Sequence, residues 1–247
     1  MELQILVPLF ALVALVYSSV GFGGGSTYLA LLVLAGCSHT STPKIALVCN
    51  LLVVAGGLVH HIHATNFRLR RALPFVFLSV PMAYLGGRIP IGRTTFLVLL
   101  GVALAAAGLR LLFIDPHRFG SKSRVRLSTP LSLGIGAALG LLSGLVGIGG
   151  GIFLAPILYL SNRYPPKEIT GLCSFFILVN SASGLAGQIT KDAAGWDVQW
   201  ILPLAIAVVC GGQVGSRLST VTMSPRSLQR VTAVLILLVS ARIGFLV

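Results

Sequence analysis

The sequence predicts an all-α polytopic membrane protein built from two inverted-topology repeats, and three observations lead to this fold class. Of the 247 residues, 55% are hydrophobic and only 9% are charged, whereas an ordinary soluble domain carries about 25% charged residues. Apolar stretches of the kind that form membrane helices recur along the chain. A glycine-rich motif also occurs twice, in two halves whose other residues keep the same order.

The repeat begins with the motif. Residues 20–25 read VGFGGG and residues 146–151 read VGIGGG. A single GxGGG would be a weak signal, because glycine is common in membrane helices, but here the same order of residues follows both copies. The matched pairs are Cys49 with Cys173, Pro74 with Pro203, Gly86 with Gly215, Arg88 with Arg217, and Arg110 with Arg242. We therefore expect an N-terminal repeat (1–114), a polar linker (115–129) and a C-terminal repeat (130–247) in one integrated transmembrane domain.

Each half contains five hydrophobic segments, of which the second is short. A helix over residues 151–161 would extend only about 16 Å, against a hydrocarbon core of about 30 Å. We expect the second segment of each half to be a half-helix that follows a GxGGG break. The expected segments are 3–20, 25–36, 45–64, 72–87 and 94–114 in the first half, and 130–146, 151–161, 168–189, 199–215 and 227–246 in the second.

The distribution of basic residues predicts the topology, because Lys and Arg collect in cytoplasmic loops. If every segment crosses, one side has twelve of them: Arg68, Arg70, Arg71, Arg118, Lys122, Arg124, Arg126, Arg163, Lys167, Arg217, Arg226 and Arg230. The other side then has only Lys44, Arg88, Arg93 and Lys191. Merging each short segment into its predecessor gives eight against eight. The first arrangement makes the halves inverted copies, with a cytoplasmic linker and both termini outside.

This topology also explains the formal charge of +13. The basic residues are scattered through short loops and form no basic face for nucleic acid. The expected location is a cytoplasmic membrane, the inner membrane of a bacterium, with lipid as a partner. A homodimer is compatible with the sequence, which does not fix the oligomeric state.

The two glycine breaks predict an anion site. Unpaired backbone is too costly to face lipid, so each break must face protein or a cavity. Each break also opens onto the N-terminus of a short helix, where free N–H groups and the helix dipole favour negative charge. The predicted substrate-binding residues are Gly23, Gly24, Gly25, Ser26 and Thr27 in the first break and Gly149, Gly150 and Gly151 in the second. The alternative is that these glycines only permit close helix crossing.

Further candidates for the site are polar residues within apolar segments. Asn50, Asn180 and Gln188 could bind a solute, or they could join helices to each other. Cys49 and Cys173 could contact a sulfur-bearing solute, or they could be small apolar filler. Arg88 and Arg217 could grip oxyanion oxygens at two points, or their side chains could reach the headgroups.

Neither catalysis nor a cofactor is expected. Cys37, Cys49, Cys173 and Cys210 lack the CxxC spacing of a zinc site. No acid, base and nucleophile recur at a usable spacing. We therefore expect neither metal nor cofactor, and an intramembrane enzyme is the weaker alternative.

Taken together, the repeated GxGGG and the later glycine-rich stretch that ends in Arg resemble the TauE/SafE sulfite exporter family, also called the toluene sulfonate uptake permease family. The resemblance rests on residues 20–26, 146–152, 86–88 and 211–217 and covers almost the whole chain. It implies a small sulfur-containing anion, such as sulfite, thiosulfate or sulfoacetate, as the solute. We therefore expect a secondary transporter that moves this anion by alternating access. An anion channel remains the nearest alternative, because opposed half-helices can also line a pore.

Overall fold

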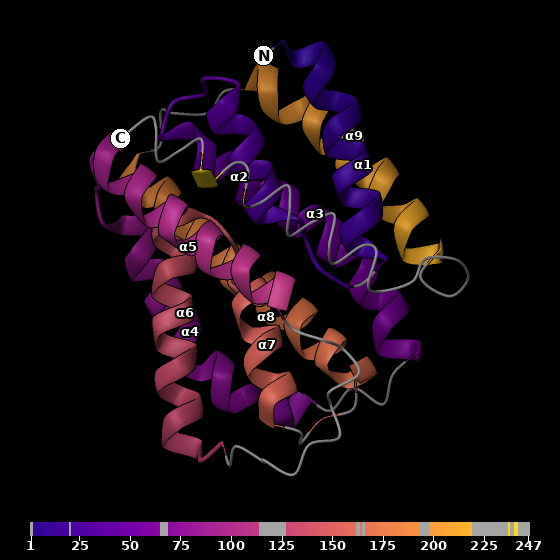
Figure 1. Ribbon diagram of the computed structural model, residues 1–247, viewed down its shortest axis with the longest axis vertical. Coiled ribbons are helices and arrows are strands. Elements are labelled where there is room, and N and C mark those ends of the chain that lie inside the picture. Colours follow the sequence, from indigo (N-terminus) through magenta and orange to yellow (C-terminus); the bar gives the residue numbers. More distant parts are fainter. Residues whose placement is uncertain are drawn as a thin grey trace.

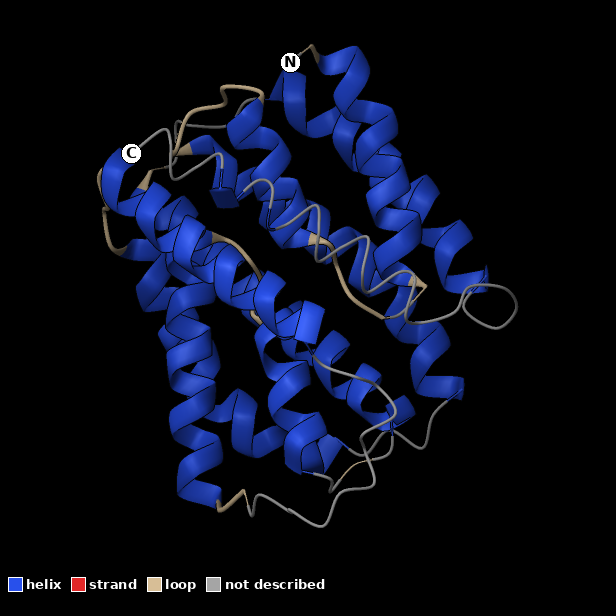
Figure 2. Cartoon of the chain, in the orientation of Figure 1, coloured by secondary structure: helices blue, strands red, loops and turns tan. Residues whose placement is uncertain are grey.

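In the computed structural model, the regular elements of the described part are all helices. The described part comprises residues 2–19, 21–64, 69–113, 127–161, 166–192 and 198–218 together with residues 164, 237, 240 and 241. Figure 2 shows no strand in these ranges. The helices, drawn in Figure 1, are α1 (Leu3–Ser18), α2 (Gly25–Leu34), α3 (Ser41–Ala64), α4 (Leu69–Arg88), α5 (Arg93–Phe113), α6 (Thr129–Val146), α7 (Gly151–Ser161), α8 (Pro166–Lys191) and α9 (Val198–Leu218).

These helices coincide closely with the first nine predicted segments. The largest difference is at the start of α3, which begins at Ser41, four residues before the predicted segment. The short second segments are short helices, with ten residues in α2 and eleven in α7. Of the tenth predicted segment, 227–246, only residues 237, 240 and 241 lie within the described part; the Ser240 hydroxyl donates to the Gly101 carbonyl of α5 at 2.9 Å. Residues 115–126 of the predicted linker lie outside it.

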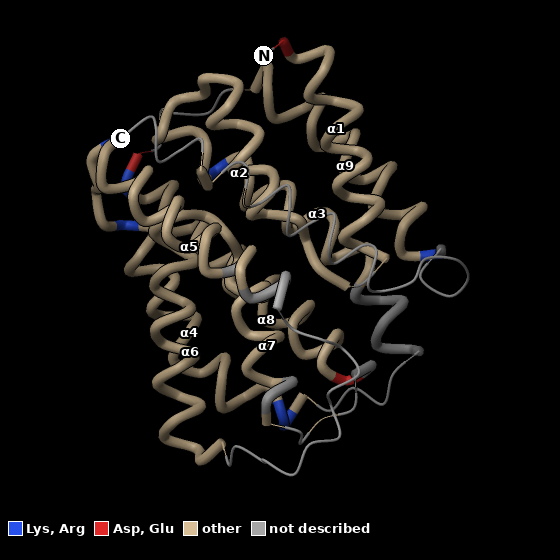
Figure 3. The backbone as a smooth tube through the Cα atoms, viewed as in Figure 1, with Lys and Arg blue, Asp and Glu red and all other residues tan. Residues whose placement is uncertain are grey.

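The surface of the bundle is apolar and suits lipid. Three described helices are long and apolar enough to cross a membrane, namely Thr129–Val146, Glu168–Lys191 and Val198–Arg217. Large side chains point outward from several helices, for example Phe77 with 73% of its surface exposed and Val102 with 65%. Figure 3 shows charged residues at the ends of helices and in connections. A soluble protein rarely exposes so much apolar surface, so the prediction of a polytopic membrane protein is confirmed.

Glycines bring α6 into direct contact with α4. Gly136, Gly140 and Gly144 are spaced four residues apart, so they lie on one face of α6. A Cβ added to any of them would collide with a backbone carbonyl of α4, which belongs to Phe75, Ser79 or Ala83 respectively. This is the small-residue packing by which membrane helices approach closely. On the other side of the molecule, Gly211 and Gly215 of α9 lie against the carbonyls of Ala11 and Leu15 of α1 in the same way.

The helix contacts are reciprocal between the halves. The fourth helix of each half packs on the first helix of the other, as α4 on α6 and α9 on α1. It also packs on the third helix of the other half, as α4 on α8 and α9 on α3. The two third helices, α3 and α8, pack on each other in the middle and run antiparallel, because Lys44 near the start of α3 bonds to Asp192 just after the end of α8. The halves are therefore interlocked and form one packed unit.

The contact between α4 and α6 predicts that alanine substitution lowers the stability of the protein at one glycine of α6 but not at another. Gly140→Ala should destabilise the protein by about 1–3 kcal/mol, because the new methyl group must displace the backbone of α4 at Ser79. Gly134→Ala is the matched control, since no atom lies within 4 Å of a Cβ at that position. Thermal unfolding of both variants in detergent tests this expectation. Equal melting temperatures for the two variants would contradict it.

Candidate functional site

The first break separates α1 from α2. Gly21 has φ of 79° and Gly24 has φ of 86°, in the left-handed region that favours glycine. Gly24 is the residue before α2, and its carbonyl accepts from the N–H groups of Thr27 and Tyr28, both at 3.0 Å. The chain therefore leaves α1, turns twice through glycines, and re-enters a helix at Gly25.

The second break, between α6 and α7, is built from the same elements. Gly147, Gly149 and Gly150 have φ of 88°, 84° and 76°. Gly147 ends α6, and its N–H donates to the Ser143 carbonyl at 2.8 Å. The carbonyl of Gly150 accepts from Phe153 and Leu154, both at 3.2 Å, so that α7 starts at Gly151. Residues other than glycine rarely adopt such positive φ angles, so the turn in the backbone requires glycine at these positions.

The two breaks lie against each other, and each is held by a side chain from the third helix of the other half. Asn50 of α3 donates through Nδ2 to the Ile148 carbonyl in the second break at 3.2 Å. Ser174 of α8 donates through its hydroxyl to the Gly21 carbonyl in the first break at 2.6 Å. Asn50 and Ser174 each directly follow one of the matched cysteines. A Cβ at Gly25 would lie only 2.7 Å from the Ile148 carbonyl oxygen, which shows how closely the breaks approach.

A pocket opens where the breaks meet. In this conformation the cavity is small, with a volume of about 10 Å³, which is room for about one water molecule. Its lining residues are Tyr17, Phe22, Gly23, Gly24, Gly25, Ser26, Asn50, Ile148, Ile152 and Ile177. None of these side chains is Lys, Arg, His, Asp or Glu. The pocket is therefore polar on the side of the first break and Asn50, and apolar on the side of the second half.

The start of α2 gives this pocket its electrostatic character. The first N–H groups of a helix have no acceptor within the helix. Among the residues that the structure describes, none accepts a hydrogen bond from the N–H groups of Gly25 or Ser26. These groups and the dipole of α2 make the pocket favourable for negative charge. Ser26 and Tyr17 also line the pocket, and the hydroxyls of Tyr17 and Thr27 are hydrogen-bonded to each other at 2.8 Å.

Five of the predicted site residues line the pocket together: Gly23, Gly24, Gly25, Ser26 and Asn50. Thr27 is buried beside the pocket and bonded to Tyr17. None of the predicted glycines of the second break belongs to the pocket lining: Gly149 lies against Asn50, Gly150 against Phe176 and Gly151 against Ile177. The second half thus contributes Ile148, Ile152 and Ile177 to the pocket rather than its glycines.

The other predicted residues lie outside the pocket lining. Cys49 and Cys173 are buried in two separate apolar clusters, as expected for small apolar filler. Asn180 donates to the Phe176 carbonyl of its own helix at 2.8 Å. Gln188 donates to the Gly144 carbonyl at 2.9 Å and so joins α8 to α6. The structure therefore gives Gln188 the helix-joining role that the sequence left open.

The two matched arginines are exposed and lie at the ends of their helices. Arg88 ends α4, with its guanidinium 5.7 Å from the centre of the Tyr84 ring. Arg217 lies in the last turn of α9. Neither residue belongs to the pocket lining. Both positions suit side chains that reach toward headgroups, which is the second of the two roles considered from the sequence.

Several residues that line the pocket or hold the breaks were not predicted from the sequence. Tyr17, Ile148, Ile152 and Ile177 line the pocket but look like ordinary core residues in the sequence. Ser174 could have been found, because it follows Cys173 as Asn50 follows Cys49. The matched cysteines indicate the repeat in the sequence, but the residue after each cysteine makes the hydrogen bond to the opposite break.

Comparison with known proteins gives the family. The model of the sulfite exporter TauE/SafE family matches residues 6–243, so the chain belongs to this family. It is 28% identical to the probable membrane transporter protein y4hK of Sinorhizobium fredii, over 92% of both chains. It is 25% identical to the probable membrane transporter protein YunE of Bacillus subtilis, over 96% of this chain and 93% of that one. No solved structure gives a significant match. The chain is accordingly a multi-pass membrane transporter.

The geometry of the first break predicts the effect of a single methyl group. Gly25→Ala should abolish transport, because the Cβ would collide with the Asn50 amide and the Ile148 carbonyl and so displace two residues of the pocket lining. Gly57→Ala in α3 is the control, since no atom lies within 4 Å of a Cβ there. Solute uptake into proteoliposomes measures the effect, with elution as a single species in size-exclusion chromatography as the test of folding. Wild-type uptake by a folded Gly25→Ala protein would rule out the pocket.

Proposed function

We propose that this member of the TauE/SafE sulfite exporter family is a secondary carrier that binds a small sulfur-containing anion in the pocket between the two breaks and exposes it alternately to each side of the membrane. The observation that carries the proposal is the meeting of the two breaks around Asn50. Unpaired N–H groups at the start of α2 supply the attraction for an anion. The pocket must widen to admit even a solute the size of sulfite, and a large organic molecule would need a much larger opening.

An inverted repeat supports alternating access, because two equivalent states arise when the halves exchange conformations. The antiparallel course of α3 and α8 fits inverted halves, since these helices hold equivalent places in the repeat. The reciprocal contacts of α4 with α6 and of α9 with α1 fit the same arrangement. We therefore assign the halves opposite orientations, with the cytoplasmic linker expected from the basic residues.

Two ion pairs would serve as the closures of such a carrier. Lys44 and Glu168 hold equivalent places, each five residues before its matched cysteine, and both side chains are buried. Lys44 pairs with Asp192 at 3.1 Å, and Glu168 pairs with Arg71 at 2.5 Å. The two pairs lie near opposite ends of α8, whose 26 residues extend about 39 Å. Each pair joins one half to the other.

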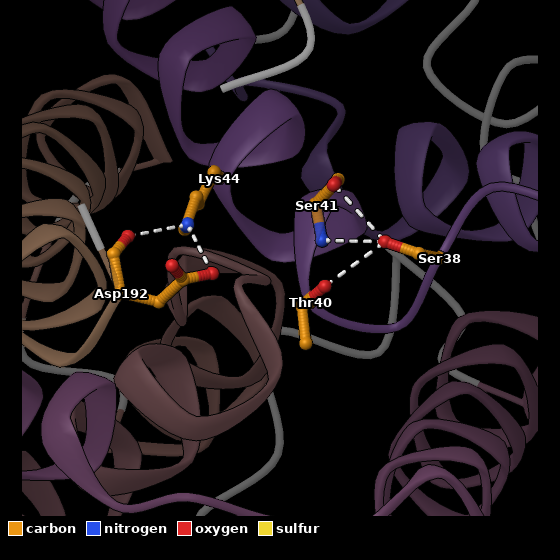
Figure 4. A network of polar contacts seen from close by, with 5 residues as sticks. All are labelled: Ser38, Thr40, Ser41, Lys44 and Asp192. Carbon is orange, nitrogen blue, oxygen red and sulfur yellow. Dashed lines mark hydrogen bonds and ion pairs between the residues drawn. The ribbon is translucent and has the colours of Figure 1, made fainter. Parts of the chain in front are cut away.

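Figure 4 shows the first of these pairs. The Lys44 ammonium group donates both to the Asp192 carboxylate and to its backbone carbonyl, the latter at 2.6 Å. The hydroxyl of Ser38 accepts from the Ser41 N–H at 3.1 Å and so holds the turn that enters α3. Because Lys44 is 1% exposed whereas Asp192 is 37% exposed, opening this end would bring a buried cation into water. Such a step is reversible at modest cost, because the charge exchanges its partner for solvent.

If the two ion pairs close the carrier at opposite ends, then removing one pair should open the pocket to one side of the membrane only. Lys44→Met should raise the accessibility of the pocket from the side of Asp192, and Glu168→Gln should raise it from the side of Arg71. Each variant is the matched control for the other, because equivalent residues change at opposite ends. The measurement is labelling of an Ile152→Cys reporter by a membrane-impermeant thiol reagent in oriented vesicles, in a background without the native cysteines. If both variants favour labelling from the same side, the ion pairs are not the two closures.

Transport itself separates a carrier from a channel. A carrier should show saturable counterflow of labelled sulfite in proteoliposomes, with accumulation driven by unlabelled sulfite on the opposite side. Large single-channel currents without counterflow would contradict the proposal and favour a pore. Empty liposomes and liposomes with the Gly25→Ala protein are the controls for leakage.

A further inference from the structure

The pocket contains one buried polar atom without a partner among the described residues, the Oδ1 of Asn50. The residue is fully buried, and its Nδ2 donates to the Ile148 carbonyl. This bond fixes the orientation of the amide, because only the nitrogen can face a carbonyl oxygen. The Oδ1 is therefore turned away from Ile148 and toward Gly23, where it would touch an added Cβ.

An acceptor that is buried without a donor costs free energy. Five other buried polar atoms also lack partners in the described part of the chain: Tyr28 OH, Ser143 Oγ, Asn180 Oδ1, Ser181 Oγ and Gln188 Oε1. None of their residues lines the pocket. Asn50 is thus distinguished by its position in the pocket lining, because a solute that enters when the pocket widens could supply the missing donor.

The charge of the lining limits what this solute can be. The lining residues include no Lys, Arg or His, and the start of α2 contributes about half a positive charge. A monoanion can be balanced by these dipoles, whereas a dianion would retain an uncompensated buried charge. The pocket therefore favours one negative charge on the solute.

We propose that the site selects a monoanion that carries its own hydrogen-bond donor, of which hydrogensulfite is the simplest sulfur example. The anionic oxygens accept from the N–H groups of Gly25 and Ser26, and the donor of the solute bonds to Asn50 Oδ1. Asn50 is thus a specificity-determining residue that recognises the hydrogen-bond donor of the solute, while the start of α2 recognises its negative charge. This inference rests on the proposed function and specifies the class of anion that the same pocket takes.

Two ligands of equal charge and similar shape test whether the site requires a hydrogen-bond donor on the solute. Sulfamate and methanesulfonate are both tetrahedral monoanions of nearly equal size, but only sulfamate has an N–H donor in place of the methyl group. The full-length protein in detergent should bind sulfamate about tenfold or more tightly than methanesulfonate, because a buried acceptor is satisfied only by the former. Isothermal titration calorimetry gives both affinities, and hydrogensulfite should compete with sulfamate.

Asn50→Ser then tests the residue. Ser174 already shows that a serine at the equivalent place can donate to the opposite break, so the variant can keep the contact with Ile148 while it loses the amide oxygen. The affinities of this variant for sulfamate and methanesulfonate should be about equal. Size-exclusion chromatography should show that the variant is folded. Gln188→Ser is the matched control, because it removes a buried amide outside the pocket and should leave the preference unchanged.

The outcomes separate this inference from the proposed function. Equal affinities of the wild type for sulfamate and methanesulfonate would overturn the inference, as would an undiminished preference in a folded Asn50→Ser protein. In either case an anion still binds, and the proposed function stands. Failure of the wild type to bind sulfamate, methanesulfonate or hydrogensulfite would instead remove the anion site itself.

Discussion

The structure depends on one constraint, the cost of unpaired backbone polar groups inside a membrane. Each glycine break removes several N–H and carbonyl groups from the hydrogen bonds of a helix, and lipid offers them no partners. The protein meets this cost by placing the breaks against each other and holding each with a side chain from the opposite half. Asn50 holds the Ile148 carbonyl, and Ser174 holds the Gly21 carbonyl. The interior contact between the halves follows directly from the breaks.

The same contact explains why the rest of the bundle is packed as it is. Breaks that face each other require the halves to interlock, and glycines on α6 and α9 let the neighbouring helices approach to backbone contact. Around this rigid packing, the ion pairs Lys44 with Asp192 and Arg71 with Glu168 join the halves near their edges.

The sequence predicted the helices well because their signals are local. Apolar length and the GxGGG motif located α2 and α7, including the start of α7 at Gly151. The break itself pointed to Gly23, Gly24, Gly25 and Ser26, and a polar side chain at membrane depth pointed to Asn50. The structure places all five in the lining of one pocket. Ile148, Ile152 and Ile177 could not be predicted, since their place in the pocket depends on how two distant segments meet. For the same reason, pairing of Lys44 with Asp192 across 148 positions has no signal in one sequence.

The central claim is that an oxyanion binds between the two breaks, and locating a bound anion tests it most directly. Selenite resembles sulfite in shape, and its selenium scatters X-rays anomalously, so a crystal of the complex would show the position of the anion without ambiguity. We expect a single anomalous peak within hydrogen-bonding distance of the Gly25 and Ser26 N–H groups and beside Asn50. A peak only near Arg88 or Arg217, with the space between the breaks empty, would contradict the account.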